Sequence, residues 1–286
     1  MNQSPSFDAF RFLESPLGGA PALAMTRIES NARLRFAVAQ AIAQGRVKFH
    51  FQPVVRAERP DFVAFHEMLA RIHLPGGQVL SAGAFMPAIE DGELGRAIDR
   101  LALRQALRVL VENPTLRISV NMSPRSMGDE EWLSVLAAAH RGGSGVCGRL
   151  ILEITEDAAL ADAGQTLDFM DHVRRMGPAF ALDDFGAGAT GFGHFRHFRF
   201  DMVKIDGAFV QGVHGSRDSQ VLVDCLMTLS RHFEMLTVAE RVENEADAAW
   251  LRGAGVDCLQ GYLYGRPAVS PSKPGADDAP LRAIAG

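Results

Sequence analysis

Polar side chains recur along this sequence where apolar runs come to an end. They are Glu67, Arg71, Asn121, Glu153, Glu156, Asp183, Asp184, Lys204, Asp206, Glu240, Glu243 and Gln260. Glu153 is the most informative, since it lies within the apolar run LILEIT, where an unpaired carboxylate is costly or takes up a proton. A salt bridge is the more common explanation for one buried acid. So many polar sites in succession favour a bound cation instead.

The ligand types indicate which metal such a site would hold. Carboxylate and amide oxygens, without clustered cysteine or histidine, favour Mg²⁺ or Mn²⁺ over zinc. The three cysteines, Cys147, Cys225 and Cys258, are widely spaced, and we expect them to be reduced. Asp183 and Asp184 are adjacent, and at a strand end two such acids could flank two cations about 4 Å apart. A helix N-cap role for Asp184 is the alternative.

Two cationic residues lie near the acids in the sequence. Lys204 precedes Asp206 by two residues and shares its strand face, where it could orient a water molecule or neutralise charge at phosphorus. A buried pair between this lysine and a carboxylate is the alternative, and both roles can hold at once. Arg71 follows Glu67 by four residues, with Leu69 between them on the same strand face. Its guanidinium suits a phosphate oxygen.

These side chains need a scaffold that brings strand ends together. From about residue 31, strand-like and helix-like segments alternate, with about eight strands over roughly 240 residues. This α/β pattern predicts a single-domain (β/α)8, TIM-like barrel more strongly than an open doubly wound sheet. Functional groups would then gather at the C-terminal ends of the strands. Residues 1–30 and 269–286 are rich in small residues and proline, and we expect both segments to be flexible.

Composition and charge exclude several classes of protein. The formal net charge of -5 argues against general electrostatic binding to duplex nucleic acid or to an anionic membrane. No window of about 18 residues is uninterruptedly apolar, and the first residues lack the order of a secretory signal. We therefore expect a cytoplasmic protein without membrane insertion.

A series of short motifs carries a family resemblance. The motifs HEMLAR, SVNMSPR, LEITE, DDFGAG, VKIDGAFV, VAERVE and LQGYLYGRP occur in this order. They resemble the EAL-domain family of cyclic di-GMP phosphodiesterases, and the resemblance covers about residues 31–268. It implies a modified (β/α)8 barrel of the EAL type that hydrolyses cyclic di-GMP to linear pGpG, with Mg²⁺ or Mn²⁺ as two bound ions.

The resemblance also implies roles for individual positions. Metal ligands are expected at Glu67, Asn121, Glu153, Asp183, Asp184 and Glu240. Substrate contacts are expected at Gln52, Leu69, Arg71, Asp206 and Gln260. Catalytic roles are expected for Glu67 and Glu240, for Lys204 as the contact to the attacking water, and for Glu156, which would steady the loop after Asp184.

Two departures from the family pattern bear on turnover. The loop that usually reads DFGTGYSS is DFGAGATG here, with Ala189, Thr190 and Gly191, and the resemblance implies that this loop positions metals and the contacts of a homodimer. Arg241 stands where the family usually has glycine. That position could demand a backbone angle that arginine adopts less readily, or could place a charge near the substrate. A catalytically weak receptor for cyclic di-GMP, or a protein-interaction module, is therefore the alternative function.

A literal GxGxxG at residues 186–191 suggests a third function, a nucleotide-dependent dehydrogenase. Asp183 and Asp184 immediately before it would repel a pyrophosphate, and HFRHFRF after it is a poor helix start. A loop covering the metal site explains these glycines better.

Overall fold

A closed ring of strands forms the centre of the computed structural model, which describes residues 19–186 and 198–272. The ring contains β1 (Val47–Arg56), β2 (Val63–His73), β4 (Ile118–Asn121), β5 (Leu150–Thr155), β6 (Ala179–Phe185), β7 (Met202–Ile205), β8 (Leu236–Ala239) and β9 (Cys258–Gln260). It closes because β1 pairs with both β2 and β9. A short further strand, β3 (Val79–Ser81), pairs with β2 outside the ring. The predicted barrel is confirmed, and the open sheet is wrong.

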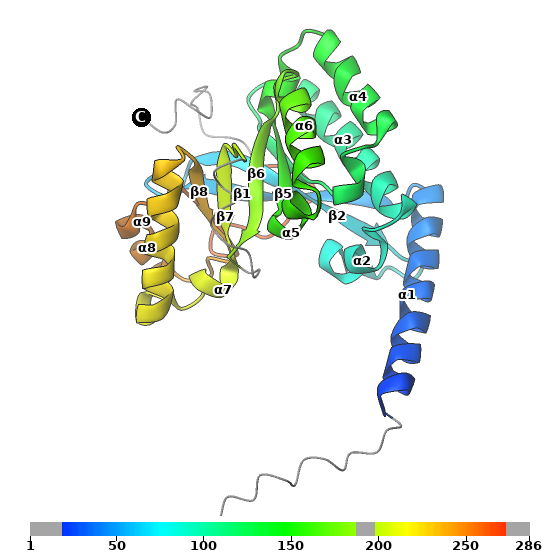
Figure 1. The fold of residues 1–286 in the computed structure, drawn as a ribbon, viewed down its shortest axis with the longest axis horizontal. Coiled ribbons are helices and arrows are strands. Elements are labelled where there is room, and N and C mark those ends of the chain that lie inside the picture. The colour runs from blue at the N-terminus through cyan, green and yellow to red at the C-terminus, as the bar shows by residue number, and fades with distance from the viewer. Residues whose placement is uncertain (1–18, 187–197, 273–286) are drawn as a thin grey trace, which may run out of the picture.

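Helices surround this ring (Figure 1). They are α1 (Gly19–Ala43), α2 (Ala82–Ile89), α3 (Glu93–Glu112), α4 (Glu130–Arg141), α5 (Glu156–Ala161), α6 (Ala163–Arg174), α7 (Gly207–Val210), α8 (Arg217–His232) and α9 (Glu245–Ala254), with 3₁₀ turns η1 (Pro124–Ser126), η2 (Val146–Arg149) and η4 (Val213–Gly215). In the described parts of the chain, no helix has the length and apolar character to cross a membrane.

The first helix reaches into the N-terminal segment. α1 begins at Gly19, so residues 19–30 are helical although we expected flexibility up to residue 30. Alanine, leucine and methionine in this stretch favour a helix, and a proline within the first turn is tolerated there. Residues 1–18 and 273–286, the rest of the two segments expected to be flexible, lie outside the described residues.

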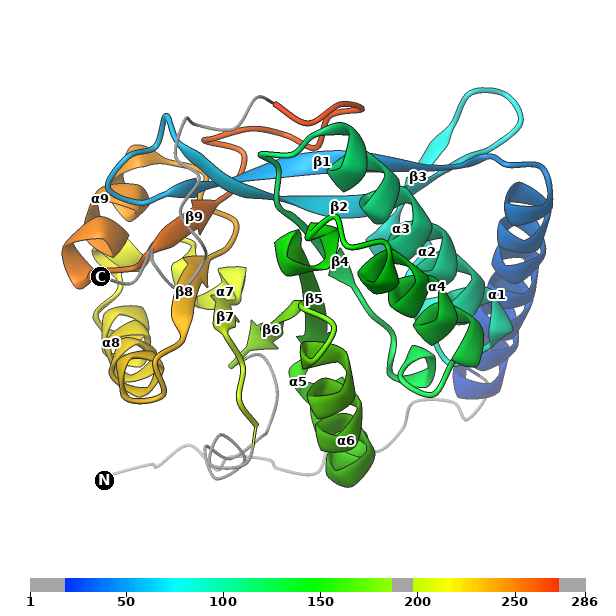
Figure 2. The same cartoon turned by 90° about the horizontal axis from the view of Figure 1, so that it is seen from above.

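The first two strands break the alternation of strand and helix. β1 pairs antiparallel with β2 and with β9, whereas the neighbouring pairs from β2 through β4 and on to β9 are parallel. In Figure 2 the two strands run as a long pair across one side of the molecule. Glu67 consequently lies in the middle of β2 and not at its end, because β2 pairs with β4 only around Glu67 and then continues outward to β3. The sequence-based placement of Glu67 at a strand end is therefore wrong.

Side chains of the strands separate into an inner and an outer layer. On β5, Leu150, Leu152 and Ile154 belong to the large apolar cluster shared with the helices, which includes Trp132 of α4. Ile151 belongs to a smaller cluster made entirely of strand residues. Alternation along the strand puts Glu153 on the same inner side as Ile151. The barrel interior is thus apolar in one part and acidic in the next.

A buried carboxyl outside the barrel makes the free energy of unfolding depend on pH. Asp99 of α3 accepts hydrogen bonds from the Ser123 backbone N–H at 2.8 Å and from Ser126 Oγ at 2.7 Å. Burial nevertheless raises the pKa of Asp99 from 3.8 to about 6. The folded state holds this proton more tightly than the unfolded state, so this contribution to stability is lost as the pH rises through the folded pKa.

We expect Asp99→Asn to remove this dependence, because the amide can accept the same hydrogen bonds without ionising. Between pH 5 and pH 8 the wild type should lose about 1–1.5 kcal/mol of unfolding free energy that the variant keeps. Urea unfolding of both proteins at the two pH values measures the difference. If the unfolding free energies of the variant and the wild type changed equally between the two pH values, the expectation would be contradicted.

Candidate functional site

Lys204 lies at the centre of the acidic part of the barrel. Its Nζ atom is 2.6 Å from Glu240 Oε1, 2.8 Å from Glu153 Oε2, 3.1 Å from Asp183 Oδ1 and 3.6 Å from Glu67 Oε2. The lysine side chain is 1% exposed. The buried pairing with carboxylates considered from the sequence is confirmed. One ammonium group meets four carboxylates that are far apart in the sequence.

Three amide side chains gather around Glu67. Asn121 Nδ2 donates to Glu67 Oε1 at 2.9 Å, and Gln260 Nε2 donates to Glu67 Oε2 at 2.5 Å. Gln260 Nε2 also donates to Gln52 Oε1 at 3.4 Å. Gln52 lies directly opposite Glu67 in the β1–β2 pair. Both oxygens of this carboxylate are therefore fixed in direction by neighbouring strands.

Asp184 has a backbone conformation that is uncommon for a residue with a side chain. Its φ is 55°, and the pairing of β6 with β7 shifts register between Leu182 and Phe185. Carboxylate oxygens of Asp183, Asp184 and Glu240 consequently lie within 4.8 Å of one another and could hold a metal ion. The unusual backbone thus brings the adjacent acids Asp183 and Asp184 together at the end of β6. β6 continues through Phe185, so Asp184 is not a helix N-cap.

The electrostatics of this group favour additional positive charge. Burial raises the pKa of Glu153, and raises that of Glu240 to about 8, although the Lys204 charge opposes both shifts. Burial and Asp183 raise the pKa of Asp184. For Glu67, burial is outweighed by the Lys204 charge and by the amide hydrogen bonds, so its pKa is lowered. One lysine therefore does not balance the carboxylates.

Three buried oxygens in the site also lack hydrogen bonds. Glu153 Oε1, Asp183 Oδ1 and Gln260 Oε1 have no hydrogen-bond partner among the residues that the structure describes, although Asp183 Oδ1 lies 3.1 Å from Lys204 Nζ as an ion pair. An unpaired buried acceptor is costly unless a cation or another donor reaches it. Since the donors here are oxygens alone, the set fits a hard divalent cation such as Mg²⁺ or Mn²⁺.

The expected substrate-contacting residues continue along β2. Leu69 and Arg71 follow Glu67 at two-residue intervals and are half-buried, whereas the residues between them are buried on the other face. In the antiparallel register, His50 lies opposite Leu69 and Lys48 lies opposite Arg71. The long β1–β2 pair thus extends from the acidic group as a partly cationic face.

Two residues beside this face were missed by the sequence interpretation. Tyr262 is close enough to Arg71 to influence its pKa, which burial lowers, and the Arg266 guanidinium lies 4.0 Å from the centroid of the Tyr262 ring. The motif LQGYLYGRP contains both residues, shortly after Gln260. Its aromatic and basic side chains are the signal that could have identified them.

Glu156 and Asp206 lie next to the acidic group. Glu156, the first residue of α5, is buried and accepts a hydrogen bond from the Gly186 N–H at 3.4 Å, where the loop after Asp184 begins. Residues 187–197, which include Ala189, Thr190, Gly191 and most of the GxGxxG motif, lie outside the described residues. Asp206 is buried and caps α7 through the Ala208 N–H at 2.8 Å. Its contact with substrate stays a prediction.

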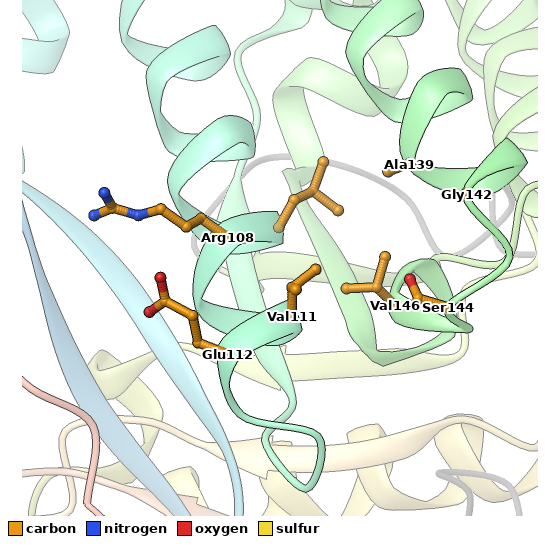
Figure 3. A pocket seen from close by; sticks show the side chains of 8 residues that line it. Arg108, Val111, Glu112, Ala139, Gly142, Ser144 and Val146 are labelled. Carbon is orange, nitrogen blue, oxygen red and sulfur yellow. The ribbon is translucent and has the colours of Figure 1, made fainter.

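A separate cavity is lined by other residues. It has a volume of about 370 Å³ and lies near the C-terminal ends of α3 and α4 (Figure 3). Its lining consists of Leu107, Arg108, Val111, Glu112, Ala139, Gly142, Ser144 and Val146. None of the acidic-site residues lines it, so the chemistry inferred from the sequence does not belong there.

Known proteins share these sequence and structural features. The cyclic di-GMP phosphodiesterase PdeB of Shewanella oneidensis is 32% identical over 234 residues, which is 80% of this chain and 27% of PdeB. The cyclic di-GMP phosphodiesterase PdeF of Escherichia coli is 30% identical over 210 residues, 71% of this chain and 28% of PdeF. The chain therefore spans less than a third of the length of either relative.

A solved structure and a family model agree with these relatives. The structure of the PaMucR phosphodiesterase in complex with cyclic di-GMP superposes with a TM-score of 0.73 and 28% identity, covering 82% of this chain and 97% of that one. The model of the EAL domain matches residues 35–267. These residues include the whole barrel and every residue of the acidic group. The chain therefore belongs to the EAL domain family.

Proposed function

We propose that this chain hydrolyses cyclic di-GMP to linear pGpG, using divalent cations bound at the acidic group. The observation that carries the proposal is Lys204 Nζ within 3.6 Å of four converging carboxylates. The relatives PdeB and PdeF are named as phosphodiesterases of this dinucleotide, and the PaMucR structure is its complex. We take residues 31–268 as the catalytic domain.

We assign the metal ligands to one set of side chains. They are Glu67, Asn121, Glu153, Asp183, Asp184 and Glu240. Two ions, Mg²⁺ or Mn²⁺, would balance the carboxylates that a single lysine leaves uncompensated. When bound, such cations polarise a phosphoryl oxygen and lower the pKa of water.

The remaining residues position the substrate and the attacking water. The Lys204 ammonium can donate a hydrogen bond to that water and stabilise negative charge as it develops at phosphorus. Gln52 and Arg71 offer donors along the β1–β2 face, and Leu69 offers an apolar contact to a base. Glu156 holds Gly186 and thereby the start of the neighbouring loop. Because these groups are fixed before substrate arrives, little reorganisation accompanies the reaction.

The proposal extends to the location and assembly of the chain. We place it in the cytoplasm, supported by free thiols at Cys147, Cys225 and Cys258. A net charge of -5 supports a small anionic substrate held by local cations, with no duplex nucleic acid as a partner. A homodimer is proposed from the family resemblance, and sedimentation of the purified chain tests it.

Purified chain incubated with cyclic di-GMP and Mn²⁺ should produce pGpG, and excess chelator should abolish the product. Glu67→Ala should lower kcat/KM by at least about 10³-fold, because it removes a proposed ligand that two amides orient. Glu112→Ala, which removes an exposed carboxylate at the end of α3, is the matched control and should keep full activity. Chromatography of the products measures the activity of the wild type, with and without chelator, and of both variants. Calorimetric binding by the wild type without any pGpG would contradict hydrolysis and favour a receptor.

Lys204→Met should destabilise the metal-free protein by about 3–5 kcal/mol, because four buried carboxylates lose their shared partner. Added Mn²⁺ should then raise the melting temperature of this variant more than that of the wild type. Thermal unfolding at pH 8, with chelator and with Mn²⁺, gives both values. Lys48→Met, at an exposed lysine of β1, serves as the control. Equal melting temperatures of Lys204→Met and wild type in chelator would refute the structural role.

A further inference from the structure

We propose that Arg241 binds a phosphate oxygen of the dinucleotide at the mouth of the acidic group, an inference that rests on the proposed function. The mouth is the solvent-facing edge formed by Asp184 and Glu240. Arg241 follows Glu240 directly and is exposed. Its guanidinium would supply there the positive charge that Lys204, buried among carboxylates, does not present to solvent.

The backbone of Arg241 is the first observation that carries this inference. Its φ is 52°, in the left-handed region that glycine adopts without a steric penalty. The sequence-based expectation of an unusual angle at this position is therefore confirmed. Among the described residues other than glycine, only Asp184, Glu234 and Arg241 have positive φ, and two of these border the acidic group. This conformation costs free energy in a residue with a side chain, so an arginine here indicates that its side chain makes a compensating interaction.

The path of the side chain is the second observation. A Cβ atom built on Gly207 would lie 2.3 Å from Arg241 Cδ, 2.7 Å from its Cγ and 2.8 Å from its Cβ. The aliphatic part of Arg241 therefore packs directly on Gly207, the residue that begins α7 after Asp206. This contact places the side chain over the end of β7, whose two neighbours in the ring are β8, which precedes Arg241, and β6, which carries Asp184.

The charge of Arg241 is the third observation. Arg241 directly follows Glu240, one of the two acids that form the mouth, so its charge belongs to the chain segment at this edge. No ion pair between residues in the described ranges includes Arg241. A guanidinium group presents paired donors that match the oxygens of a phosphate. The side chain is thus held by its stem, with its donors available to an anionic ligand.

Arg241→Gly tests this role with two measurements, because the substitution should weaken substrate binding and at the same time stabilise the fold. Loss of a charge-assisted contact should raise the KM for cyclic di-GMP about 10-fold while kcat stays within about two-fold. Relief of the backbone strain should raise the melting temperature by about 2 °C. If Arg241 had a purely structural role, Arg241→Gly would lower the melting temperature and leave KM unchanged. Arg241→Lys keeps the charge without the paired donors, and should raise KM by about three-fold with no gain in melting temperature.

Gly207→Ala tests the geometry without changing any charge. The added methyl group should displace the Arg241 stem and raise KM by about as much as Arg241→Gly does. In the Arg241→Gly background the same alanine should change KM by less than about two-fold, because the displaced side chain is gone. Equal effects of the alanine in both backgrounds would show that the contact does not govern substrate binding.

Failure of this inference is distinguishable from failure of the proposed function. If the wild type yields pGpG and Arg241→Gly has an unchanged KM, the role of Arg241 is wrong and the hydrolysis stands. If the wild type yields no pGpG, calorimetric titration of cyclic di-GMP in chelator replaces the kinetic comparison. A weaker Kd in Arg241→Gly would then support the phosphate contact in a receptor, and an equal Kd would overturn it. No binding by the wild type would overturn both proposals.

Discussion

The contact of one buried ammonium group with four carboxylates is the constraint around which this barrel is arranged. Lys204 loses its hydration in a barrel interior, and that cost is offset only if several anionic groups reach it. The carboxylates come from β2, β5, β6 and the end of β8. Each strand must therefore keep its register, since a shift of one residue would turn its acid away from the interior.

Because β1 runs antiparallel to its neighbours, the site has a second part beside the acidic group, which is the face of the long β1–β2 pair. In a barrel of alternating strands and helices each strand ends at the rim, and functional groups meet only there. Here β1 and β2 form an antiparallel pair that continues beyond the ring, so Glu67 lies mid-strand and the same face carries Leu69 and Arg71 outward. The proposed substrate has two phosphates and would extend beyond the proposed metal ligands. The extended face provides donors along that length, from the acidic group to the surface.

Two residues with left-handed backbone conformation, Asp184 and Arg241, direct side chains at the rim of the barrel in ways that regular strand geometry does not allow. At Asp184 the unusual φ brings adjacent acids together, so that they and Glu240 converge within 4.8 Å. At Arg241 it directs a long cationic side chain over Gly207. Both conformations carry an energetic cost, and both lie where the barrel meets solvent. Strain of this kind persists because neighbouring backbone is fixed: Phe185 pairs with Ile205 of β7, and the Val242 N–H donates to the Gln260 carbonyl oxygen.

The sequence by itself determined the order of most strands and helices and the polar residues available as ligands, and it offered an unusual backbone angle as one of two explanations for Arg241. Hydrophobic periodicity records which residues are buried, so β5 could be identified and Glu153 recognised as a buried acid. The tertiary structure alone decided the direction of β1 and the mid-strand position of Glu67. Periodicity is the same for a strand in either direction, and it does not specify a distant partner. The meeting of Lys204 with its carboxylates depends on barrel closure, which joins residues far apart in the chain.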